Sequence, residues 1–126
     1  MSAKSVPEDL VRFIHTSIAG VPHLEALLLV RTAPDELWDV EVVSNRLYLP
    51  APKVRELLGS LCSSGMLIEE AGKYRYHPSS EELRQMIDQL SDCYRNNLVE
   101  ITQIIHSGTG KKAQAFADAF RWEKDS

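Results

Sequence analysis

The stretch from Trp38 to Pro78 restricts the fold most, because two short amphipathic segments in it run directly into an alternating hairpin pattern. Asp39 is a suitable N-cap for a helix over Val40 to Leu47. A second helix is expected to begin near Pro50 or Pro52, since proline fits the first turn of a helix. Its apolar residues recur at the spacing of one helical face, and they are Val54, Leu57, Leu58 and Leu61.

A glycine and a hairpin follow the second helix. Gly65 suits the position after a helix, where the left-handed conformation is common. The chain then reads as a strand over Met66 to Glu69, a turn over Glu70 to Gly72 and an alternating, aromatic-rich return strand over Lys73 to His77. The predicted order is therefore helix, helix, strand, turn and strand.

This order resembles the winged-helix transcriptional regulators of bacteria, broadly the MarR, PadR and ArsR types. The likeness covers Val21 to Pro78, and the residues that carry it are Trp38-Asp39, Leu47, Leu49-Pro50, Val54, Leu58, Gly65-Met66-Leu67 and Tyr74-Arg75-Tyr76. It implies a mainly α fold with a small β-hairpin, a winged helix-turn-helix. One residue departs from the pattern: Tyr48 stands where such proteins often have glycine. Either the turn has a different geometry or Tyr48 is strained.

Two helices are expected before this motif. Ser5-Val6-Pro7-Glu8 reads as a capping box for a helix from Pro7 to Ala19. A second helix, from Pro22 to Thr32, is apolar around most of its circumference, so we expect it to be the most buried. Residues 1–78 then form the N-terminal helices and the winged core, and residues 79–126 form a C-terminal helical extension within one structural domain.

The C-terminal extension is expected to hold a long dimerisation helix. Ser79 or Ser80 would cap it, and it would run to about His106. Its heptad seam consists of Leu83, Ile87, Leu90, Tyr94, Asn97, Ile101 and Ile104. A second stripe through Leu98, Ile101 and Ile105 indicates that the seam shifts near Asn97. A core this small cannot cover so long a helix, which favours a homodimer; the alternative is that the helix folds back over its own domain. A last helix is expected over Lys112 to Trp122.

The resemblance implies double-stranded DNA as a partner, with the second motif helix in the major groove. The net charge of −4 argues against bulk electrostatic binding, but residues 44–77 hold five basic and three acidic residues. The candidate DNA-binding residues are Asn45, Arg46, Ala51, Pro52, Lys53, Arg55, Glu56, Ser60, Lys73 and Arg75. The alternative is a non-catalytic winged-helix module for protein–protein interaction, in which these are ordinary solvated charges.

Other kinds of site find little support. The four histidines are scattered and no cysteine lies beside one, so neither a metal nor another cofactor is expected. The glycines of residues 108–112 lack the spacing of a phosphate loop, and nothing indicates an enzyme. A small-molecule effector between Trp38, Tyr94, Phe116, Phe120 and Trp122 is possible, although such aromatics are more often core.

The two cysteines, Cys62 and Cys93, read as free thiols in a reducing compartment. No apolar run has the length of a membrane span, and the N-terminus lacks a signal pattern, so we expect a cytoplasmic protein without a membrane partner.

Overall fold

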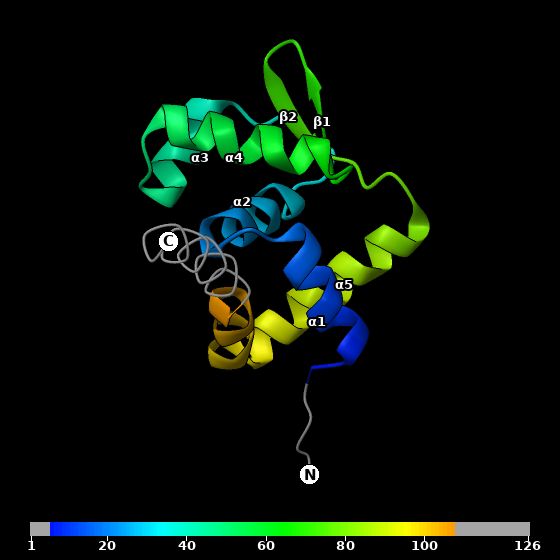
Figure 1. Cartoon of the computed structure of the whole chain (residues 1–126). Coiled ribbons are helices and arrows are strands. Elements are labelled where there is room, and N and C mark those ends of the chain that lie inside the picture. Colours follow the sequence, from blue (N-terminus) through cyan, green and yellow to red (C-terminus); the bar gives the residue numbers. More distant parts are fainter. Residues whose placement is uncertain (1–5, 108–126) are drawn as a thin grey trace, which may run out of the picture.

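The computed structural model describes residues 6–107, and it is mainly α-helical with one small hairpin. Its elements are α1 (Glu8–Ser17), α2 (Val21–Arg31), α3 (Val40–Leu47), α4 (Ala51–Ser63), β1 (Leu67–Glu70), β2 (Lys73–Tyr76) and α5 (Glu81–Asn96) (Figure 1). A further helical segment covers residues 98–107. The predicted fold class is confirmed. The helix expected over Lys112 to Trp122 lies outside the described residues.

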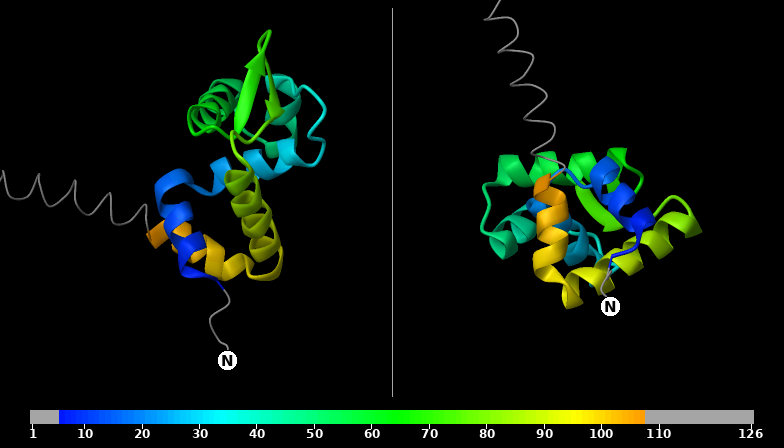
Figure 2. Two further views of the ribbon diagram at one scale, coloured as in Figure 1. Left: turned by 90° about the vertical axis from the view of Figure 1, so that its right-hand side faces the viewer. Right: turned by 60° about the horizontal axis from the view of Figure 1, so that its bottom comes forward.

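Helix α2 lies at the centre of the molecule. It contacts α3, α4 and β2, and its residues Leu24, Ala26, Leu27 and Val30 are all inaccessible to solvent. Figures 1 and 2 show α3, α4 and the hairpin on one side of α2, with α1, α5 and residues 98–107 on the other. The expectation that α2 is the most buried helix is confirmed, because four of its eleven residues are buried, a larger share than in α1, α3, α4 or α5.

Local capping signals set several helix starts. The carboxylate of Asp39 accepts a hydrogen bond from the Glu41 amide at 3.2 Å, and α3 has the predicted bounds. The Ser80 hydroxyl accepts one from the Leu83 amide at 3.1 Å, so Ser80 caps α5. The predicted capping box before α1 is wrong, because this helix begins at Glu8 after the extended residue Pro7, without a side-chain cap.

The hairpin is antiparallel and is tied to the segment before α3. Leu67 pairs with Tyr76, and Glu70 pairs with Lys73. The Trp38 amide donates to the Tyr74 carbonyl at 2.6 Å, and the Tyr74 amide donates back to the Trp38 carbonyl at 3.0 Å. This bridge adds a third chain segment beside β2, so it fixes the hairpin relative to the start of α3.

The predicted long C-terminal helix is wrong, because it is interrupted at Asn97. This residue has φ −136° and ψ 55°. Its amide donates to the Cys93 carbonyl at 2.7 Å and ends α5, while its carbonyl accepts from the Ile101 amide at 3.0 Å and begins the next helix. Figure 2 shows residues 98–107 running in a different direction from α5. Asparagine favours such helix ends, since its short polar side chain suits non-helical backbone.

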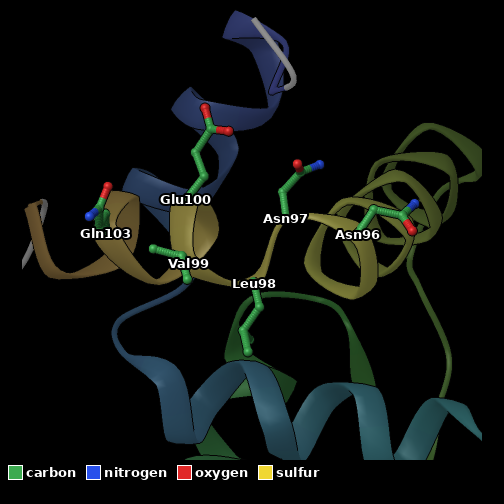
Figure 3. Close-up of a pocket in the computed structure, with 6 residues that line it drawn as sticks. All are labelled: Asn96, Asn97, Leu98, Val99, Glu100 and Gln103. Carbon is green, nitrogen blue, oxygen red and sulfur yellow. The ribbon is translucent and has the colours of Figure 1, made fainter. Parts of the chain in front are cut away.

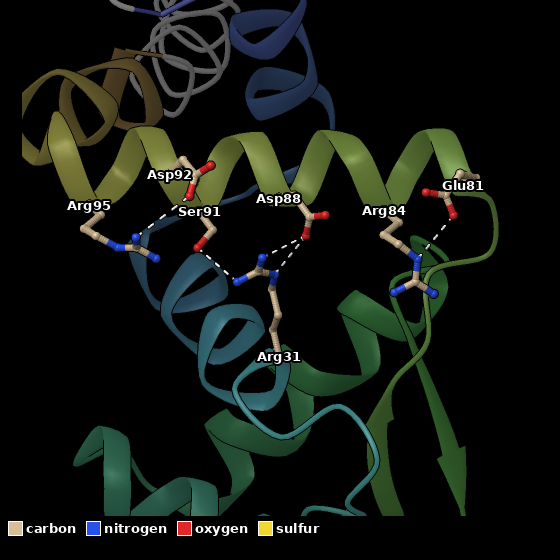
Figure 4. Close-up of polar contacts among 7 residues, drawn as sticks. All are labelled: Arg31, Glu81, Arg84, Asp88, Ser91, Asp92 and Arg95. Atoms are coloured by element: carbon tan, nitrogen blue, oxygen red, sulfur yellow. Dashed lines mark hydrogen bonds and ion pairs between the residues drawn. The ribbon is translucent and has the colours of Figure 1, made fainter.

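A polar contact joins α2 to α5. The Arg31 guanidinium donates to the Asp88 carboxylate at 2.8 and 3.2 Å and to the Ser91 hydroxyl at 3.1 Å (Figure 4). The other two ion pairs in Figure 4 lie within α5 itself and join residues three apart. Arg31 therefore fixes α5 to the central helix.

Candidate nucleic-acid interface

Helix α4 divides into an apolar face and a charged face. Val54, Leu57, Leu58 and Leu61 are buried, as their spacing predicts. The candidate residues on the other face are exposed, namely Pro52, Lys53, Arg55, Glu56 and Ser60, and Ala51 is half-buried. Ser60 lies seven residues after Lys53, which places it about two turns further along the helix.

The cations of α4 are largely available to a partner. Lys53 Nζ lies 3.7 Å from Glu56 Oε1, but 48% and 74% of these side chains are exposed. Water and salt screen such a pair, so it stabilises the helix little. Arg55 makes no ion pair with any of the residues that the structure describes. The first two turns of α4 therefore present two positive charges and one negative charge to solvent.

The end of α3 adds another cation. Asn45 and Arg46 are both exposed, and the Arg46 guanidinium lies 5.9 Å from the centre of the Trp38 ring. A cation over an aromatic face is held weakly in place while its outer side remains open. Tyr48, the C-cap of α3, has φ 58° and ψ 43°. The turn therefore has the left-handed geometry for which glycine is suited, and Tyr48 is the strained residue.

The hairpin is less cationic than its sequence indicates. Arg75 lies 2.8 Å from the Glu70 carboxylate, with only 29% of its side chain exposed. Lys73 is paired in register with the same Glu70, and Glu69 adds a second negative charge. The two hairpin cations are thus balanced by two carboxylates, and the positive charge of residues 44–77 is concentrated on α3 and α4.

Sequence reasoning missed the electrostatic coupling of a histidine on α2 to α4. The His23 Nδ1 atom is buried and has no hydrogen-bond partner among the described residues. Burial lowers the pKa of His23, and the charge of Lys53 lowers it further, while Glu56 raises it. The charge of His23, on α2, therefore interacts with the charges of Lys53 and Glu56 on the exposed face of α4. No motif in the sequence indicates this interaction, since it joins residues from two separate helices.

One solved structure has a fold similar to that of this chain. It is the solution structure of the homodimeric winged helix-turn-helix DNA-binding domain (fragment 1–100) of a possible ArsR-family transcriptional regulator from Mycobacterium bovis. The TM-score is 0.51 at 17% sequence identity, and the match covers 79% of this chain and 95% of that chain. The chain has a winged helix-turn-helix fold. No protein-family model matches the sequence, and neither does any curated protein sequence.

In this winged-helix fold, α3 and α4 form the helix-turn-helix, and β1 and β2 form the wing. Asn45 and Arg46 lie at the end of α3, on the other side of the α3–α4 turn from Ala51, Pro52, Lys53, Arg55 and Glu56 in the first two turns of α4, while Ser60 lies further along α4. Lys73 and Arg75 lie on β2 on either side of Tyr74, the residue that is bridged to Trp38. The sequence therefore predicted the helices and strands that carry the candidate residues, whereas the position of Arg46 over the Trp38 ring is seen only in the folded chain.

The proposed dimerisation seam has two kinds of members. Ile87, Leu90 and Ile101 have no exposed surface within the single chain, so they pack against their own domain. The half-buried members are Leu83, Tyr94, Asn97 and Ile104. Beside the break at Asn97, Leu98 and Val99 are 53% and 68% exposed. The unbroken seam is therefore replaced by two shorter faces. Of the second stripe, Ile101 and Ile105 pack inward, whereas Leu98 is exposed.

An open hollow of about 560 Å³ lies at the junction of α5 with residues 98–107. Its lining residues are Asn96, Asn97, Leu98, Val99, Glu100 and Gln103 (Figure 3). Figure 3 shows Leu98 directed toward α2, with Asn97 and Glu100 pointing to the opposite side. Neither Trp38 nor Tyr94 lines this hollow. The Tyr94 hydroxyl instead donates to Glu25 at 3.3 Å, and Phe116, Phe120 and Trp122 lie outside the described residues.

Within residues 6–107, no group of three or more metal-ligating side chains is close enough to hold an ion. Cys62 and Cys93 are half-buried free thiols, and burial raises the pKa of each. In the same range no single helix is long and apolar enough to cross a membrane; α1 and α2 together meet that test by length and composition only, with a bend of 103° between them.

Proposed function

We propose that this protein is a sequence-specific DNA-binding transcriptional regulator that acts as a homodimer, and that it is not an enzyme. The observation that carries the proposal is the exposed face of α4 in a winged helix-turn-helix, where Lys53 and Arg55 lie within the first two turns. The structural neighbour, itself a homodimeric DNA-binding domain, supports the same direction.

In this proposal α4 enters the major groove with its N-terminal turns foremost. Lys53 and Arg55 contact guanine or phosphate, and Glu56 accepts from cytosine. Asn45 and Arg46 contact the phosphate backbone beside the groove, which positions the helix without selecting a sequence. Ala51, Pro52 and Ser60 complete the surface that faces the DNA. Lys73 and Arg75 contribute less, because Glu69 and Glu70 offset their charge.

The dimer places two copies of α4 on a pseudo-palindromic site whose half-sites lie about one helical turn apart. The dimer contacts would come from the half-buried seam residues, because Ile87, Leu90 and Ile101 are already completely buried within each chain. These half-buried residues are Leu83, Tyr94, Asn97 and Ile104. Sedimentation at micromolar concentration measures this directly, and a monomer there would remove the dimer from the proposal.

The deciding experiment is selection of bound sequences from a pool of randomised duplex DNA at two salt concentrations. An enriched inverted repeat is expected. On the selected site, the double variant Lys53→Ala/Arg55→Ala should bind at least tenfold more weakly. Its salt dependence should also be shallower by roughly 0.9 in log K per log salt for each phosphate that the variant no longer neutralises.

The matched control is Arg12→Ala/Arg95→Ala, which removes the same charge from exposed positions on α1 and α5. It should leave the affinity near that of the unmodified protein. Equal losses in both double variants would mean that only net charge matters. The absence of enrichment at either salt concentration would instead favour the alternative, a winged-helix module that binds another protein.

A further inference from the structure

Tyr48 combines an unfavourable backbone conformation with a solvent-exposed side chain. Its φ of 58° lies in the left-handed region, which non-glycine residues enter at a cost. Its side chain is 92% exposed, more than that of any other exposed large hydrophobic residue in the described chain. The ring therefore gains almost nothing from packing that would offset the strained backbone.

The geometry of the turn does not depend on the tyrosine side chain. The Ser44 carbonyl accepts hydrogen bonds from the amides of both Tyr48 and Leu49, the latter at 3.2 Å. The Ser44 hydroxyl donates to the Leu49 carbonyl. These contacts impose the left-handed conformation on whichever residue occupies position 48. Glycine or asparagine would meet the same demand with less strain.

Three cations lie close to Tyr48 along the chain. Arg46 lies two residues before it, and Lys53 and Arg55 lie on the helix that begins after the turn. Exposed tyrosines that bind proteins usually lie in a desolvated apolar centre. At this turn the chemistry instead suits an anion, because the phenol is a good donor to a phosphate oxygen and the cations attract the same group.

We infer that Tyr48 is a DNA-backbone contact, in which its hydroxyl donates a hydrogen bond to a phosphate beside the groove that α4 enters. This inference rests on the proposed function, and it adds a binding residue that the motif pattern does not contain. The contact involves a neutral donor, so no counterion is released on its account. It therefore has a different signature from the contacts of Lys53 and Arg55.

Two variants of Tyr48 test this inference on the selected DNA site. Tyr48→Phe keeps the ring and the strain but lacks the hydroxyl. It should bind DNA about tenfold more weakly, with an unchanged melting temperature and an unchanged salt slope. Tyr48→Asn relieves strain and removes the ring. It should raise the melting temperature by roughly 2–4 °C and still weaken DNA binding.

Ala71→Asn is the matched control, because Ala71 has φ 53° at the tip of the wing but carries only a methyl group. It should raise the melting temperature without weakening DNA binding. Wild-type affinity in Tyr48→Phe would overturn the inference and leave the proposed function standing, as would an equal loss of affinity in Ala71→Asn. If the unmodified protein selects no duplex at all, the proposed function fails, and the assignment of Tyr48 fails with it.

Discussion

Replacing Gly65 with alanine should destabilise the fold strongly, because this residue connects α4 to the wing in a conformation that excludes a side chain. Gly65 has φ +80°, and an added Cβ would lie 2.8 Å from the Ser79 hydroxyl oxygen and 3.4 Å from the Ser79 Cβ. The Gly65 carbonyl also accepts a hydrogen bond from the Ser79 amide at 2.8 Å, so the two segments cannot easily move apart.

Two costs add at this position. An alanine in the left-handed region is less stable by about 1–2 kcal/mol. Crowding against Ser79 adds about 1 kcal/mol, at the lower end of overpacking costs, because the hydroxyl must move away from the new Cβ, whereas the 3.4 Å distance to the Ser79 Cβ is an ordinary van der Waals contact. The free energy of unfolding should therefore fall by roughly 2–3 kcal/mol, which corresponds to a decrease in melting temperature of about 8–15 °C.

Urea denaturation followed by circular dichroism measures the free energy of unfolding, and a double-mutant cycle with Ser79→Ala separates the two costs. The penalty of Gly65→Ala should shrink by about 1 kcal/mol in the Ser79→Ala background, where the hydroxyl is absent. A control on α4, the helix that precedes Gly65, is Gly59→Ala, whose new Cβ would meet no atom within 4 Å. That change should stabilise the protein by about 0.5–1 kcal/mol. Equal effects at positions 65 and 59 would refute the reasoning.

Two further predictions concern α2. Arg31→Ala should lower the free energy of unfolding by about 1 kcal/mol in urea titrations, because it removes the ion pair with Asp88. The side chains of Arg31 and Asp88 are 28% and 49% exposed, respectively. Arg31→Lys, which lacks the planar fork, should recover less than half of that loss. For His23 the folded state disfavours the protonated ring, so the free energy of unfolding should be greatest above about pH 6.5 and fall as the pH drops below it. His23→Gln should lose this component of the pH dependence. If the free energy of unfolding of His23→Gln varied with pH as in the unmodified protein, the pH dependence could not be attributed to His23.

The helix-turn-helix and the wing were largely predictable, because their signals are local. Asp39 caps α3, whose bounds agree with the prediction, and Pro50 immediately precedes α4. Gly65 and Gly72 both have positive φ, as glycines after a helix and in a hairpin turn often do. Each of these signals depends on the steric properties of one or two residues, so it does not require knowledge of the folded chain.

The path of the C-terminal part was not predictable from periodicity. A heptad pattern records which residues are apolar, and it continues unchanged when a helix stops and another begins with suitable spacing. Asn97 was the one polar member of the seam, and it is where α5 ends. Whether an asparagine continues a helix or ends it depends on tertiary contacts, here the burial of Ile101 and Ile105 in the core. Those contacts involve α1 as well, since His15 Nε2 lies 3.2 Å from the Ile104 carbonyl.

Two left-handed positions, 65 and 48, differ in how their residues fit the fold. At position 65 the fold leaves no room for a side chain, and the residue is glycine. At position 48 the backbone has the same handedness, but the side chain extends into solvent. Folding alone would accept glycine or asparagine there, since the contacts that define the turn come from Ser44 and Leu49. The tyrosine therefore destabilises the fold and makes no contact within residues 6–107 that offsets this cost. Residues that depart from the local backbone preference in this way are expected where the side chain binds a partner.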